Sequence, residues 1–132
     1  MGGAITSLNT TVENIVSVHE QTLANGKARE YKFSSGLLII NICITGLSLT
    51  STQASQGLYL FEVSSSHINY TYNTPFVDAP TVSAFGHSNG NTWLSFANPT
   101  SVKTKMSYAE FFAIVSSTVL VGFSMTLTGR WK

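Results

Sequence analysis

The stretch that decides the fold is TVLVGFSMTLTGRWK, residues 118–132. Every second residue of its middle part is apolar: Phe123, Met125 and Leu127. The positions between them carry small polar side chains: Ser124, Thr126 and Thr128. A period of two is that of a β-strand with one buried and one solvated face. The stretch therefore predicts a long strand, in which Gly122 allows a bulge or bend.

Turn signals divide the rest of the chain into further short segments with strand character. These segments are residues 29–33, 37–45, 58–64, 67–73, 81–85, 92–98 and 103–116. Residues 37–45 (LLIINICIT) are apolar enough to predict burial on both faces, with Gly46 ending the strand and a polar loop following. Residues 58–64 and 67–73 predict a hairpin. Roughly eight short strands predict an all-β sandwich, jelly roll or small barrel.

The first two dozen residues show a different spacing. Ile5, Leu8, Val12 and Ile15 are three, four and three positions apart, and the same register brings His19 to the next seam position. This is the pattern of a narrow coiled-coil seam, and it predicts a helix over residues 4–24 that ends before Asn25-Gly26. An extended lead-in segment is the alternative. The predicted domains are a helical stem, residues 1–26, and a β head, residues 27–132.

Composition limits the classes of function. The 132 residues fit one domain; 43% are hydrophobic, only 10% are charged and the net charge is +1. Because no basic stripe is present, a nucleic-acid partner is not expected. We expect no membrane insertion and no signal peptide, since no apolar stretch approaches the length of a membrane helix or follows a basic leader. The single cysteine, Cys43, lies in an apolar run and is expected to be buried.

Residues for catalysis are not apparent. No two acidic residues lie within four positions of each other, and the three histidines lack metal-ligand spacing. Neither a phosphate-binding loop nor a nucleophile elbow is present. The sequence therefore predicts a protein that is not an enzyme and that uses no metal or cofactor. In a trimeric seam, three copies of His19 could meet near the axis and hold an ion, the alternative being a solvated histidine.

Candidate recognition residues cluster near predicted turns and on one strand. They are Asp78, His87, Asn89, Asn91, Trp93 and Tyr72. Saccharides pack their C–H faces on aromatic rings and exchange hydrogen bonds with planar polar side chains, which these residue types supply. The same residues are also ordinary turn formers, and Trp93 could instead lie in the core.

The order of a short heptad stretch, a β head containing ITGLSLTSTQASQGLYLFEVSSSHINYT and the ending GFSMTLTGRWK is similar to a known family. It resembles the C-terminal receptor-binding head domains of tail-fibre and baseplate proteins from phages of Gram-positive bacteria. The resemblance implies a homotrimer with a coiled-coil stem and a jelly-roll-like head that binds host cell-wall or surface polysaccharide. It also implies a place in the virion beside other baseplate or tail proteins, after synthesis in the host cytoplasm.

Apolar residues on both faces of the predicted strands favour an oligomer, because identical subunits would cover the second face. Two alternatives to the adhesin remain open: a purely structural trimeric virion or appendage protein, and a trimeric ligand of the tumour-necrosis-factor or C1q type. Trp131 and Arg130 are expected to fix the chain end, with Arg130 pairing with an acidic residue such as Glu110 or Glu62, stacking on a ring, or remaining solvated.

Overall fold

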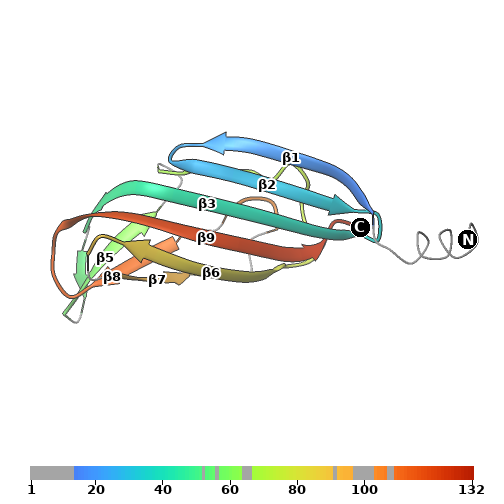
Figure 1. Cartoon of the computed structure of the whole chain (residues 1–132). Helices are drawn as coiled ribbons and strands as arrows, with labels where there is room; N and C mark the ends of the chain where they lie inside the picture. The colour runs from blue at the N-terminus through green and yellow to red at the C-terminus, as the bar shows by residue number, and fades with distance from the viewer. Residues whose placement is uncertain are drawn as a thin grey trace, which may run out of the picture.

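The computed structural model describes residues 14–51, 53–55, 57–63, 67–90, 92–96, 103–106 and 109–132. This part of the chain is all-β and forms two antiparallel sheets (Figure 1). The strands are β1 (Ile15–Leu23), β2 (Gly26–Phe33), β3 (Leu37–Thr50), β4 (Gln53–Ser55), β5 (Leu58–Val63), β6 (Thr81–Ser88), β7 (Thr92–Phe96), β8 (Ala109–Ala113) and β9 (Thr118–Arg130). The all-β prediction is thus confirmed.

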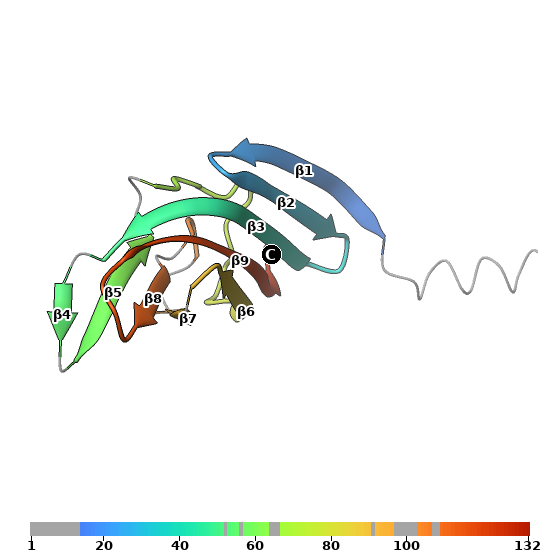
Figure 2. The ribbon, with the colours of Figure 1, turned by 60° about the vertical axis from the view of Figure 1, so that its left-hand side comes forward.

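The two sheets lie one over the other, with the core between them (Figure 2). The larger sheet has the order β1-β2-β3-β9-β6, and the smaller one has the order β4-β5-β8-β7. The arrangement is compatible with a β-sandwich. The smaller sheet lies behind the β3, β9 and β6 part of the larger sheet, whereas β1 and β2 extend beyond it (Figures 1 and 2).

The long strand predicted over the end of the chain is confirmed as β9. Its apolar residues Phe123, Met125 and Leu127 are at most 1% exposed, and the residues between them face away from the core. β9 pairs with β3 along its whole length, and the register shifts between Ile44 and Leu47. Two residues of β3 there oppose the single residue Gly122 of β9, so the bend predicted from Gly122 is a β-bulge in the partner strand.

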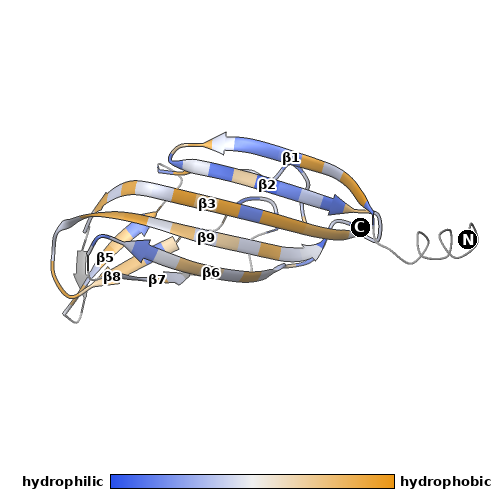
Figure 3. Cartoon of the chain, in the orientation of Figure 1, coloured by the Kyte–Doolittle hydropathy of each residue, from blue (hydrophilic) through white to orange (hydrophobic). Residues whose placement is uncertain are grey.

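The structure corrects two predictions about β3. The strand does not end at Gly46 but passes through the bulge, where Gly46 has φ +66°, and continues to Thr50. Its burial alternates, so only one face lies in the core, and Cys43 is exposed on the other face. In Figure 3, β3 and parts of β9 are apolar, whereas β2, which lies beside β3, is mostly polar. The prediction of burial on both faces was wrong because the outward-facing residues of β3 are themselves partly apolar, although they are not buried.

The helix predicted over residues 4–24 is wrong for its described part. Residues Ile15–Leu23 form strand β1, which pairs with β2 in an antiparallel hairpin. Ala24 and Asn25 make the turn, and Asn25 adopts φ +69°, a conformation that asparagine tolerates in two-residue hairpin loops. The Asn-Gly signal therefore marks a hairpin and not a helix end, and residues 15–26 belong to the larger sheet. Ile5, Leu8 and Val12 of the predicted seam lie outside the described residues.

The hairpin predicted between residues 58–64 and 67–73 is also wrong in its second half. Residues 67–80 contain no strand beyond the isolated bridge of Thr71 with Lys105. Their alternation has another cause: Ile68, Tyr70, Tyr72 and Phe76 all point into the core, at 2–5% exposure. This segment therefore covers part of the inner face of the larger sheet in place of a strand.

A buried carboxylate anchors the covering segment. Glu30 of β2 is 2% exposed and accepts hydrogen bonds from the Tyr70 hydroxyl, from Asn73 N at 2.7 Å and from Thr74 N at 2.9 Å. Three donors satisfy the carboxylate, which removes most of the cost of burying it. Burial, followed by the hydrogen bond to Glu30, raises the pKa of Tyr70 well above its usual value.

The chain end is fixed as the sequence predicted, but by different contacts. Trp131 Nε1 donates to Phe33 O at 2.8 Å, and Trp131 N donates to Gly36 O at 2.8 Å. Lys32 Nζ lies 4.2 Å from the centre of the indole ring, a cation–π distance. Arg130 is exposed, and its Nε donates to Lys132 O at 3.1 Å.

Candidate saccharide-binding site

Trp93 lies on the outer surface of the smaller sheet. The TWLSF sequence of β7 alternates, so Leu94 packs against the core while Trp93 points outward and is 48% exposed. Its partner across the strand pair is Phe112 of β8. The two rings are stacked, with centroids 6.2 Å apart and planes inclined by 26°. Trp93 is therefore not a core residue, and with Phe112 it forms an aromatic platform.

A polar row runs beside this platform on the same face. The register places Ser95 of β7 opposite Glu110 of β8, and Glu110 opposite Glu62 of β5. Residues two positions apart on a strand are separated by roughly 7 Å, so the row is within reach of a sugar ring lying on the platform. Carboxylate and hydroxyl oxygens accept hydrogen bonds from sugar hydroxyls. Together the two rows offer a ring surface and hydrogen-bond acceptors.

Glu62 of β5 and Glu110 of β8 lie directly opposite each other, so two carboxylates are neighbours on the outer face of the smaller sheet. No local sequence pattern indicates this pair, because the two residues are far apart in the chain and only the β5–β8 register brings them together. The role of Phe112 could not be predicted either, because only the β7–β8 register brings its ring beside that of Trp93.

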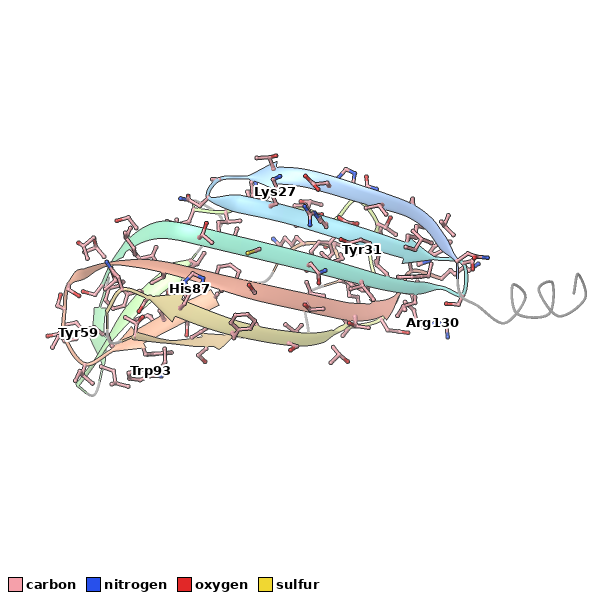
Figure 4. All side chains as sticks on the ribbon, in the orientation of Figure 1. Lys27, Tyr31, Tyr59, His87, Trp93 and Arg130 are labelled. Carbon is pink, nitrogen blue, oxygen red and sulfur yellow. The ribbon has the colours of Figure 1, made fainter. Side chains whose placement is uncertain are left out.

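The other predicted loop residues do not join Trp93. His87, near the end of β6, lies over Gly122 on the outer face of the larger sheet, since a Cβ at Gly122 would be 2.3 Å from His87 Cε1. Asn89 follows in the turn, where its Oδ1 accepts from Leu120 N at 2.9 Å and its N donates to Leu120 O at 3.0 Å. Asn89 therefore has a structural task. Figure 4 shows His87 and Trp93 on different parts of the surface.

Asp78 and Tyr72 are further away. Asp78 is exposed in the loop before β6, whereas His87 lies near the far end of that strand, roughly 20 Å from its first residue. Tyr72 is 5% exposed and belongs to the core, so the prediction that its ring meets a ligand is corrected. Asn91 lies outside the described residues. Of the predicted residues that the structure describes, only Trp93 takes part in the platform.

The predicted role is also wrong for the two seam residues that the structure describes, Ile15 and His19. Ile15 is 55% exposed on β1, and His19 lies opposite Glu30 of β2 within one sheet. Both therefore belong to a strand and not to a helical seam. Val16 and Val18, at 56% exposure each, add to the apolar surface of this edge strand.

Two further observations concern the described residues as a whole. They contain no group of three or more histidine, cysteine or acidic side chains placed to hold a metal ion. They also contain no helix with the length and apolar character that crossing a bilayer requires. Comparison with known proteins found no matching family model, no matching curated protein and no matching solved structure.

Proposed function

We propose that the protein is a non-enzymatic receptor-binding head that binds a host-surface saccharide on the Trp93–Phe112 platform. The observation that carries the proposal is the stacked, half-exposed indole of Trp93 on the outer face of the smaller sheet. A large aromatic ring that is half-exposed at a surface can pack against ligand C–H groups, and the adjacent polar row can accept hydrogen bonds from hydroxyl donors. The low charge of the chain agrees with a neutral, hydroxyl-rich ligand.

We further propose a jelly-roll-like head. The strand order supports this, because the chain crosses between the sheets from β3 to β4, from β5 to β6, from β6 to β7 and from β8 to β9. Crossings of this kind are those of Greek-key sandwiches and jelly rolls. In this proposal the protein is a part of a phage tail fibre or baseplate, as the resemblance of its sequence to such heads implies.

The proposed assembly is a homotrimer. Exposed apolar side chains on β1 (Ile15, Val16 and Val18) support contact between copies along this edge, next to the N-terminal segment that carries the heptad spacing. Three weak sites in one trimer would bind a repetitive polysaccharide far more tightly than one site alone.

The test is binding of the purified protein to a panel of bacterial cell-wall polysaccharides. Trp93→Ala is expected to weaken binding by about tenfold or more, because the ring supplies the contact surface. Phe85→Ala is the matched control: Phe85 is 68% exposed, but on the larger sheet, and its removal should leave affinity unchanged. Circular dichroism and thermal unfolding establish that both variants are folded.

Absence of binding to every polysaccharide in the panel would contradict the proposal and favour a structural role. Equal loss in the two variants would contradict the assignment of the site. Release of new reducing ends from a bound polysaccharide would show catalysis, for which Glu62 and Glu110 would be the first residues to test, and would contradict the non-enzymatic part.

A further inference from the structure

A hollow of about 300 Å³ opens on the outer face of the larger sheet, on the opposite side of the sandwich from Trp93. It is lined by Gly26, Lys27, Arg29, Asn41, Cys43 and Thr45. The register explains why these side chains converge: Lys27 lies directly opposite Cys43, and Arg29 lies directly opposite Asn41. Figure 4 shows Lys27 beside the turn between β1 and β2. The size is at the lower end of that of small-molecule sites.

The charges at this hollow are unbalanced. Glu20 of β1 is bound by Arg29 Nε at 2.8 Å and by Lys27 Nζ at 3.3 Å. The hydrogen bond from Arg29 and then that from Lys27 lower the pKa of Glu20, so it stays ionised at neutral pH. Two cations against one carboxylate leave one positive charge at the wall of the hollow. The lysine and arginine together retain more N–H donors than the single carboxylate occupies.

Asn41 and Thr45 add further hydrogen-bond donors to the lining of the hollow. Asn41 Oδ1 accepts from Thr126 Oγ1 at 3.0 Å, which fixes the carboxamide and turns its N–H groups away from Thr126. The Thr45 hydroxyl can donate as well. Cys43 Sγ lies 3.7 Å from Ser124 Oγ and remains exposed. A site with this donor excess and a residual positive charge repels metal cations and attracts anions.

We propose that this hollow between β2 and β3 binds the anionic group of a small ligand, a carboxylate or a phosphate on a body the size of one sugar. Lys27 and Arg29 would attract the anion, and Asn41 and Thr45 would donate to its oxygens. The planar fork of arginine suits both groups. This site is separate from the proposed saccharide platform, and neither depends on the other.

Cys43 provides a direct measurement, because it is the only cysteine and lines the hollow. The rate of its alkylation by neutral iodoacetamide is measured with three ligands that share one ring: glucose, glucuronate and glucose 6-phosphate. Glucuronate, glucose 6-phosphate or both are expected to slow alkylation at least about fivefold at saturation, whereas glucose has no effect. Protection by neither anion, or equal protection by glucose, would overturn the proposal.

Variants locate the effect. Lys27→Gln with Arg29→Gln should abolish protection, and Lys105→Gln with Lys132→Gln, at two exposed lysines outside the hollow, should retain it. Equal loss in both double variants would overturn the proposal. Alkylation without ligand, together with thermal unfolding, confirms that each variant is folded. Trp93→Ala should retain protection, which separates this result from the proposed function.

The Glu20→Gln variant tests whether the carboxylate of Glu20 weakens or strengthens anion binding. Removing the internal carboxylate frees both cations, so the anion should bind about fivefold more tightly. Weaker anion binding in this variant would show that Glu20 does not compete with the ligand and would overturn the proposed charge balance.

Discussion

The Tyr70 hydroxyl donates a hydrogen bond to the buried carboxylate of Glu30, and this pair joins the covering segment of residues 67–80 to strand β2. The neighbouring Tyr72 lies in contact with the same cluster, its ring centroid 5.7 Å from that of Tyr70. Among the described residues, the Tyr72 hydroxyl is buried without a hydrogen-bond partner. The two tyrosines of this cluster therefore differ in whether the hydroxyl has a hydrogen-bond partner.

That difference predicts that replacing each tyrosine by phenylalanine changes the stability of the protein differently. Tyr70→Phe should lower the free energy of unfolding by about 2 kcal/mol, because it removes a hydrogen bond to a buried charge. Tyr72→Phe should leave stability unchanged or raise it slightly, because it removes only an unsatisfied hydroxyl. Urea denaturation measures both values. Equal losses would show that the Glu30 bond is not the cause.

The same cluster predicts sensitivity to alkali. Burial raises the pKa of Tyr70 and of Tyr72 above the usual 10.0, with the hydrogen bond and charge of Glu30 adding to the effect at Tyr70 and its charge at Tyr72. Above about pH 10 the unfolded chain releases phenol protons that the folded chain retains, so stability falls as pH rises. The urea midpoint should fall between pH 9 and pH 11, and less steeply in Tyr70→Phe/Tyr72→Phe. An unchanged slope in that variant would contradict this origin.

Gly122 should resist substitution. A Cβ there would lie 2.3 Å from His87 Cε1 and 2.5 Å from Ile44 O. The imidazole can move, but the carbonyl of the bulged strand cannot, so Gly122→Ala should cost about 1–3 kcal/mol. Adding His87→Ala should restore only part of the loss. Ser124→Ala, two positions along the same strand, is the control in thermal unfolding, and a full rescue by His87→Ala would place the clash in the side chain alone.

Trp131 should contribute to stability although it stands one residue from the end of the sequence. Trp131→Phe removes the hydrogen bond to Phe33 O and weakens the cation–π contact with Lys32, for an expected loss of about 1–2 kcal/mol. Lys132→Gln removes the more distant cation, 4.9 Å from the ring, and should cost little. Chemical denaturation followed by circular dichroism compares them. A neutral Trp131→Phe would show that the chain end is not fixed by this ring.

The apolar edge of β1 should govern assembly. The proposed trimer predicts three copies in light scattering, and Val16→Lys/Val18→Lys should yield folded monomers, because both positions are 56% exposed in the isolated chain. Thr81→Lys/Ser83→Lys on strand β6, at the other edge of the same sheet, is the control. A monomeric unmodified protein would contradict the trimer.

Local pattern was sufficient for β9, whose alternating residues leave one assignment. It was insufficient for β1, because most of its side chains are exposed on both faces and therefore show no alternation of apolar and polar residues. β-Branched Ile15, Val16 and Val18 and the Asn-Gly turn were the stronger signals there. Residues 67–73 alternate like a strand because their side chains are buried on one side, although among the described residues their backbone forms only the isolated bridge of Thr71 with Lys105.

The candidate site also contains one residue that the sequence could identify and others that it could not. Trp93 could be selected by residue type and position near a turn, but its partner Phe112 and the row of Ser95, Glu110 and Glu62 depend on which strands pair and in what register. The prediction that Tyr72 contacts a ligand was wrong, because an aromatic residue at an alternating position can face the core as well as the surface. Pairings between distant segments are not encoded in local periodicity.

The covering segment has one further consequence. Tyr72 N, Phe76 N and Met106 N donate to Thr104 O, Lys103 O and Tyr70 O, bonds that connect one irregular stretch to another, whereas Val77 N donates to Arg130 O of β9. Water can therefore enter the interior by a local opening of these two stretches while the ladder between β3 and β9 stays closed. We therefore expect the amide protons of these two stretches to exchange with solvent faster than those at the centre of the larger sheet.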